Sequence, residues 1–256
     1  MTTTLIITDV TRMNNQRVCV AAVTMDGQAI RPILPNKGEI QEIWLYQHNE
    51  AVIRPFARVG LNLLRPNPCP PHTEDWLMDP KFKRFDGLLD EEDRERILEQ
   101  MTVPCVKEMF HAEIHKPEQG RGHYVQLGEG KLSLGTLRPQ SIQFVRLYKF
   151  KGELKYRLTF VDSTGAVYNL PVTDLSYRYY LDHLRTSQGL RFGQIGFKLY
   201  KELNQARTYL RIGLTRGHHP DENQPKNRCY LQVTGVYTFP DYLEGRCFAD
   251  FDRPAL

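Results

Sequence analysis

Two stretches of the sequence have the pattern of a β-hairpin, and this pattern limits the folds open to the chain. The first runs from Val18 to Leu34 and contains Asp26-Gly27, a dipeptide that favours a tight turn between two antiparallel strands. The second runs from Tyr156 to Val172 and turns at 162–165. Its first part alternates apolar and polar residues, as a strand with one buried face does. We therefore expect a mainly β protein with a similar hairpin in each half.

The rest of the first half predicts strands, an irregular segment and two helices. Strands and loops are expected between Glu39 and Leu64. Prolines interrupt residues 65–80, which predicts irregular chain. Asp90 can cap a helix, because its carboxylate can accept a hydrogen bond from a free N–H of the first turn. A short second helix is expected over 106–114.

The second half follows a glycine-rich stretch, 116–135, which predicts a boundary between domains 1–118 and 119–256. Asp174 is expected to cap a helix there, whereas 192–203 matches no single pattern. Strands and helices alternate too little for a doubly wound parallel sheet, so the pattern favours two small barrels or one composite β structure. The strands expected in this half cover 142–150, 154–160, 166–172, 209–214 and 229–237.

Charge is divided unevenly along the chain. Residues 1–120 hold 14 Lys and Arg against 18 Asp and Glu, a net charge of −4. Residues 121–256 hold 20 against 12, a net charge of +8, and within 121–219 the balance is 16 against 6, or +10. This asymmetry indicates an anionic partner for the second half. Two alternatives stay open: the basic face could bind an acidic protein, or it could only be solvated.

Three parts of the sequence resemble the bacterial family of dual OB-domain proteins. Residues 5–8, 17–21 and 27–32 resemble that family's first hairpin, 71–76 its proline-led polar loop, and 228–240 its final strand. The resemblance implies two OB-like small β-barrels in tandem, each with about one helix. It also implies a nucleic-acid-binding role, sometimes alongside defence or repair systems. It implies no reaction and supplies no catalytic residues.

Basic residues of the second half are predicted to contact phosphates, and aromatic residues such as Tyr148 and Phe150 could stack on bases. On the strand 154–160, Tyr156 falls on the apolar face and is expected in the core, whereas Lys155 and Arg157 fall on the other face. A solvated basic face is the alternative. The residues predicted to bind nucleic acid are Arg146, Lys149, Lys151, Lys155, Arg157, Arg178, Arg185, Arg191, Lys198, Arg207, Arg211 and Arg216.

Candidate catalytic residues are confined to one loop. His72, Glu74 and Asp75 could perform acid–base chemistry. The interpretation that we favour is that this loop makes local turn hydrogen bonds while Trp76 anchors it in the core. The sequence contains no phosphate-binding loop, no Gly-x-Ser-x-Gly elbow and no His-Glu-x-x-His motif.

The signals for a metal site are weak. His111 and His115 would share one face of a helix, and 218–222 combines histidines with carboxylates. We interpret the first pair as surface histidines and the second stretch as a polar loop. The five cysteines contain no Cys-x-x-Cys pair, which favours reduced thiols over disulfides or a zinc ribbon. No metal or cofactor is therefore expected.

Three classes of function are compatible with these features. No run approaches the roughly 20 apolar residues of a membrane span, and residues 1–9 lack the features of a signal peptide, so a cytoplasmic protein is expected. The favoured function is a nucleic-acid-binding module without catalysis. The first alternative is a protein-interaction subunit of a larger assembly, in which the acidic segment 90–99 and the basic second half bind different partners. The second alternative is a nuclease that uses the 72–76 loop.

Overall fold

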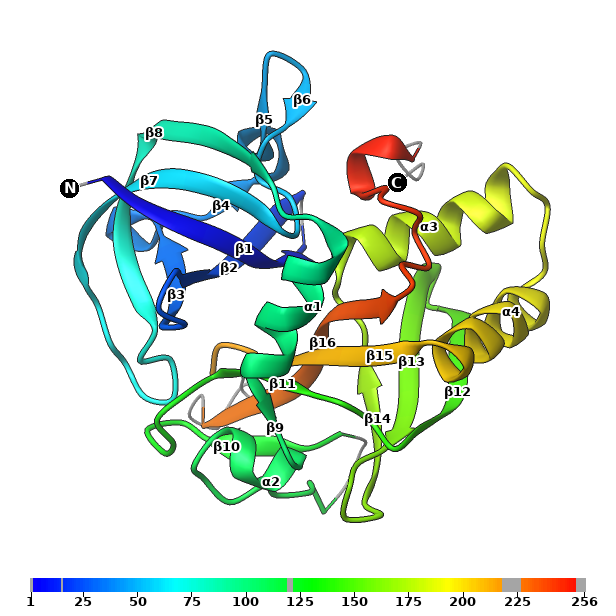
Figure 1. Ribbon diagram of the computed structural model, residues 1–256. Helices are drawn as coiled ribbons and strands as arrows, with labels where there is room; N and C mark the ends of the chain where they lie inside the picture. Colours follow the sequence, from blue (N-terminus) through cyan, green and yellow to red (C-terminus); the bar gives the residue numbers. More distant parts are fainter. Residues whose placement is uncertain (1, 15, 119–121, 218–226, 252–256) are drawn as a thin grey trace.

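A computed structural model describes residues 2–14, 16–118, 122–217 and 227–251. The chain is mainly β and forms two barrel-like sheets, one closed and one curled into a partly open barrel (Figure 1). The helices of the described part lie between and around them, and none of these is long and apolar enough to cross a membrane.

The first barrel is built from five long strands that close on themselves. β1 pairs antiparallel with both β2 and β7, β2 pairs with β3, and β7 pairs with β8. The circle is closed by a parallel pair between β3 and β8. These strands are β1 (Thr2–Arg12), β2 (Arg17–Thr24), β3 (Ala29–Ile33), β7 (Ala57–Pro66) and β8 (Asp75–Leu88). Short elements fill the connection from β3 to β7, namely η1 (Pro35–Lys37), β4 (Ile40–Gln41), η2 (Glu42–Leu45), β5 (Tyr46–Gln47) and β6 (Glu50–Ala51).

The segment between the barrels begins with α1 (Glu91–Gln100), and Asp90 caps it as predicted by accepting a hydrogen bond from Asp93 N at 2.8 Å. β9 (Thr102–Val103) follows and pairs in parallel with β11 (Leu134–Leu137) of the second barrel. α2 (Val106–Met109) is shorter than the helix predicted over 106–114. His111 has a φ of 52°, which a right-handed helix cannot contain. His111 and His115 therefore share no helix face, which the alternative of a metal site required. His111 is exposed and His115 is partly exposed, in agreement with their interpretation as surface histidines.

The second barrel repeats the strand order of the first. β11 pairs with β15 and β12 pairs with β13, so β11 and β12 together act as the first strand. β13 pairs with β14 and β15 with β16, and a parallel bridge between Val172 and Val233 joins the end of β14 to β16. The strands are β10 (Tyr124–Gln126), β11 (Leu134–Leu137), β12 (Ser141–Phe150), β13 (Glu153–Val161), β14 (Val167–Pro171), β15 (Arg207–Leu214) and β16 (Arg228–Phe239).

Two helices connect β14 to β15, and a final short helix, η3 (Phe248–Asp250), follows β16. α3 (Leu175–Thr186) is capped by Asp174 as predicted, and α4 (Phe192–Gln205) covers the segment that matched no single pattern. Two glycines lower the helix propensity of α4. Gly196 is nevertheless required, because a Cβ at this position would lie 2.5 Å from the carbonyl oxygen of Val145 on β12.

Both predicted hairpins form, whereas part of the segment predicted to be irregular is a strand. The hairpins predicted from Val18 to Leu34 and from Tyr156 to Val172 are the corresponding β2–β3 and β13–β14 hairpins of the two barrels. The prediction of irregular chain over 65–80 was wrong for residues 75–80, because β8 begins at Asp75. Its pairing with β7 jumps from Asp79 to Lys83, so Pro80 lies in a bulge where no ladder hydrogen bond is needed.

Buried polar contacts hold the two barrels against each other. Arg211 of β15 pairs with Asp9 of β1 at 2.9 Å, and both side chains are almost fully buried. The Tyr237 hydroxyl donates to the carbonyl oxygen of Thr8 at 2.6 Å. A buried charge is stable only when it is paired, so these contacts fix how the barrels meet. The boundary predicted at 118/119 stays a prediction, and β9 joins the second sheet although it precedes that position.

Candidate nucleic-acid interface

The outward surface of the sheet β12–β13–β14, here called the sheet face, gathers exposed aromatic and basic side chains. On β12, Val145 and Leu147 are buried in the core. The residues that alternate with them point outward and lie opposite residues of β13. The outward pairs are Phe144 with Thr159, Arg146 with Arg157, Tyr148 with Lys155 and Phe150 with Glu153.

Two phenylalanines stand exposed at the ends of this row. Phe144 has a relative exposure of 66% and Phe150 of 56%. They are six residues apart on one strand, which at about 3.3 Å per residue is a distance of about 20 Å. Large aromatic side chains with this exposure gain nothing from the protein core, but they offer flat surfaces on which bases can stack. The row is therefore suited to contacting several successive bases.

Positive charge lies between the phenylalanines. Arg146 and Arg157 face each other across the two strands, an arrangement that is destabilising for like charges. Arg157 donates to the side-chain oxygen of Asn169 and also to its backbone oxygen, the latter at 2.5 Å. Lys155 forms an ion pair with Glu153 at 2.5 Å. Within the residues that the structure describes, Arg146 has no carboxylate partner. A phosphate between the two guanidinium groups would relieve their repulsion.

α4 lies alongside the edge of the sheet and adds further aromatic side chains. The Asn204 amide accepts from the N–H of Ile142 at 3.0 Å and donates to its carbonyl oxygen at 2.9 Å, so the edge of β12 is covered. Tyr200 is four residues from both Asn204 and Gly196, which places it on the helix side that meets β12. Phe197, 58% exposed, stacks on Tyr200 and lies 4.5 Å from the Lys201 ammonium.

The other basic residues predicted to bind are distributed around the barrel. Lys149 and Lys151 lie exposed at the β12–β13 end of the sheet, and the Lys151 ammonium is 5.8 Å from the Phe150 ring. Tyr156 is buried, as predicted, and the Arg178 guanidinium stacks 4.7 Å from its ring, with burial lowering the pKa of Arg178. This places Arg178 on the inner side of the sheet. Three more lie on or next to the two helices, namely Arg185 on α3, Arg191 at the start of α4, and Lys198 on α4 in an ion pair with Glu202.

Three predicted arginines are held by carboxylates. Arg207 makes two hydrogen bonds to Glu95 of α1, at 2.5 and 2.6 Å. Arg216, half exposed, pairs with Asp75 at 2.6 Å. Arg211 is only 2% exposed and pairs with Asp9. A phosphate in solvent cannot reach Arg211, so the binding role predicted for it is corrected to a structural one.

The loop considered for catalysis lies inside the junction of the two barrels. His72, Glu74 and Asp75 are at most 4% exposed. Glu74 and Asp75 both pair with the buried Arg31, at 3.1 and 2.7 Å. Burial, with the charge of Arg31 adding to it, lowers the pKa of His72 to about 3. A substrate in solvent does not meet these groups, which favours a structural role for the loop. The side-chain contacts differ from the local turn hydrogen bonds that were predicted, because Asp75 pairs with Arg31 and Arg216 and the Thr73 hydroxyl donates to the Lys131 oxygen. Trp76 is only partly buried.

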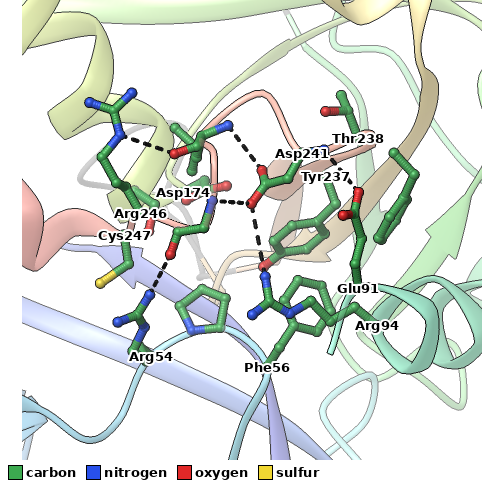
Figure 2. Close-up of a pocket in the computed structure, with 15 residues that line it drawn as sticks. Arg54, Phe56, Glu91, Arg94, Asp174, Tyr237, Thr238, Asp241, Arg246 and Cys247 are labelled. Atoms are coloured by element: carbon green, nitrogen blue, oxygen red, sulfur yellow. Dashed lines mark hydrogen bonds and ion pairs between the residues drawn. The ribbon is translucent and has the colours of Figure 1, made fainter. Parts of the chain in front are cut away.

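A narrow crevice lies where the loop before β7, α1 and the end of β16 meet (Figure 2). Its volume of about 30 Å³ is enough for about two water molecules. Its walls bond to each other, since Asp241 N donates to Glu91 at 3.2 Å and Arg54 donates to the Gly245 oxygen at 2.8 Å. Asp174 at its edge has its pKa raised to about 7 by burial. The crevice is a junction between elements and is too small for a substrate.

The described part of the chain gathers no group of three or more His, Cys, Asp or Glu side chains that could hold a metal ion. The histidine and carboxylate stretch 218–222 lies outside the described residues. All five cysteines are free thiols.

Sequence reasoning missed Phe144, the most exposed aromatic side chain of the sheet face. The register of β12 against β13 shifts between Ile142 and Phe144. Simple alternation from the buried Ile142 would place Phe144 in the core, whereas the bulge turns it outward. Phe197 and Tyr200 were missed because α4 was not assigned. No local signal in the sequence marks either feature.

The strand order, with a parallel pair between the third and fifth strands of each barrel, defines a protein of two tandem OB folds. The chain belongs to the family of dual OB-containing domains, which matches residues 3–236. This agrees with the resemblance seen in the sequence. No curated protein matches the chain.

Proposed function

We propose that the protein is a non-catalytic module that binds single-stranded RNA or DNA along the sheet face of its second barrel. The observation that carries the proposal is the outward row of Phe144, Arg146, Tyr148 and Phe150 beside Arg157. β13 and β14 are the second and third strands of the second OB fold, and OB folds bind oligonucleotides on the face of these strands. The aromatic groups are suited to bases and the cations to phosphates.

A single strand fits this row better than a duplex. Bases can stack on Phe144 and Phe150 only when they are not paired and stacked within a helix. Successive outward residues of β12 are about 6.6 Å apart, two residues of strand rise, whereas the nucleotides of one duplex strand rise about 3.4 Å each. A strand with its bases spread apart can follow the wider spacing.

The corresponding face of the first barrel is less suited to this role. Residues 21–23 of β2 are buried on both sides of the strand. The loop between β7 and β8 packs on the second barrel, where Gly128 N donates to the Pro70 oxygen at 3.1 Å. The first barrel therefore supports the second one, and the second one carries the ligand.

Fluorescence anisotropy with labelled single-stranded RNA, single-stranded DNA and duplex DNA at two salt concentrations tests the proposal. Binding to a single strand is expected to weaken steeply with salt, because phosphate contacts release counterions. Phe144→Ala is expected to cost about 1–3 kcal/mol of binding free energy, the usual value of one stacked base. Phe85→Ala, at an exposed position of the first barrel, is the matched control and should bind as the wild type does.

Absence of binding to every probe, or equal loss in both variants, would reject the sheet face as a nucleic-acid site. Co-purification of a stable protein complex together with no affinity for nucleic acid would select the interaction-subunit alternative. If the module binds, the setting that the sequence resemblance implies is a defence or repair system, where it would hold an exposed single strand.

A further inference from the structure

A polar crevice lies at the end of the sheet face, between the bend that joins β11 to β12 and the turn that joins α4 to β15. Its volume is about 150 Å³, roughly ten times the space that one water molecule needs. The crevice is therefore large enough for a tetrahedral phosphate group. Arg138 and Ser141 line it from one side, and Asn204, Arg207 and Thr208 from the other.

Two arginines converge on this crevice. Arg138 is exposed at its mouth. Arg207 is held by Glu95 through Nε and Nη2, which leaves its Nη1 outside that pair. Hydrogen bonds from Arg207 and, more weakly, the charge of Arg138 lower the pKa of Glu95, so both guanidinium groups lie close to the same carboxylate. Glu95 orients Arg207, and Arg138 adds positive charge that Glu95 does not fully neutralise.

The inner wall of the crevice is rigid. The Asn204 amide is fixed by its two hydrogen bonds to the backbone of Ile142. The Thr208 hydroxyl donates to the Leu203 oxygen at 2.6 Å. A site with its walls held in place loses little conformational entropy when a ligand enters.

The crevice lies where a single-stranded nucleic acid bound along the sheet face would have to end. Phe144 is three residues from Ser141, a distance of about 10 Å along β12. On the other side of Arg207 lies α1, which carries five acidic residues against two basic ones. Repulsion by this acidic helix opposes a polyanion that continues past the crevice.

We infer that the crevice between Arg138 and Arg207 binds the terminal phosphate of the single strand held on the sheet face. This inference rests on the proposed function. A terminal phosphomonoester carries a charge near −2 at pH 7, whereas each internal phosphodiester carries −1, so two arginines favour the end of a strand over its interior. The chemistry is shared by 5′- and 3′-phosphates, and the experiment distinguishes them.

The test compares three oligonucleotides of one sequence, with a 5′-phosphate, a 3′-phosphate, or hydroxyl groups at both ends. The wild-type protein is expected to bind one phosphorylated form about 10-fold more tightly than the hydroxyl form, the effect of one or two charge-assisted hydrogen bonds. This preference should fall below about pH 6, where the dianionic monoester takes up one proton and its charge drops from −2 to −1. Arg138→Gln should remove the preference and leave the affinity for the hydroxyl form nearly unchanged.

Two controls separate the outcomes. Arg65→Gln, at an exposed arginine of the first barrel, should keep the preference, whereas Phe144→Ala should weaken all three oligonucleotides equally. Tight binding by the wild type with no preference for a phosphorylated end would overturn the terminal-phosphate site and leave the sheet face standing. If none of the three oligonucleotides bound, the proposed function would fail, and the inference that rests on it would fail too.

Discussion

Replacing Arg146 by glutamine removes one of the two guanidinium groups that face each other across β12 and β13. Because like charges directly opposite on a sheet are destabilising, the free energy of unfolding should rise by about 0.2–1 kcal/mol. In the same variant, binding should weaken, because a phosphate contact is lost, and the slope of log affinity against log salt should fall by about one. The substitution therefore raises stability and lowers affinity.

Urea unfolding and fluorescence anisotropy on the same preparations measure both effects. The stability gain should shrink in high salt, since surface charges are screened there. Arg65→Gln serves as the control for loss of a surface arginine. It should neither raise the free energy of unfolding nor lower the affinity for a single strand. The account of Arg146 is refuted if the variant is less stable than the wild type, or if it binds a single strand with unchanged affinity and salt slope.

Three further substitutions and one control substitution test the fold. Burial raises the pKa of Asp174 to about 7, so between about pH 4 and pH 7 the folded state holds a proton that the unfolded state does not. The free energy of unfolding should therefore fall as the pH rises through this range. Asp174→Asn should flatten this dependence in urea midpoints measured at pH 5 and pH 8. Arg211→Ala leaves Asp9 buried without its partner and should cost about 3–5 kcal/mol in urea unfolding; a cost under about 1 kcal/mol would contradict the buried pair. Gly196→Ala should destabilise by about 1–3 kcal/mol, because its Cβ meets a backbone oxygen. Gly193→Ala, in open space on the same helix, should be neutral or slightly stabilising in thermal unfolding.

Local patterns in the sequence were sufficient to predict part of the fold. The Asp26-Gly27 turn and the alternation around Tyr156 identified the hairpins that occupy the same place in each barrel. Asp90 and Asp174 were recognised as helix caps because capping depends on residues only three positions apart. These features depend on chemistry within a few residues, so a single sequence can indicate them.

The features that were missed depend on contacts between distant segments. Arg211 looked like a surface cation, and its partner Asp9 lies 202 residues away. Phe144 points outward because of a bulge that its pairing with β13 creates. Helix α4 was not assigned, and its Gly196 is explained by the close approach of the helix to β12. The crevice at Arg138 and Arg207 likewise exists only where β11, α4 and β15 meet.

The most direct test of the account is to locate a bound strand by photo-crosslinking. A single-stranded RNA with 4-thiouridine, or DNA with 5-iodouracil, would be irradiated on the wild-type protein, and the crosslinked peptides would be identified by mass spectrometry. The account predicts crosslinks on β12, at Phe144, Tyr148 or Phe150. Crosslinks confined to the first barrel, with none on β12, would contradict it.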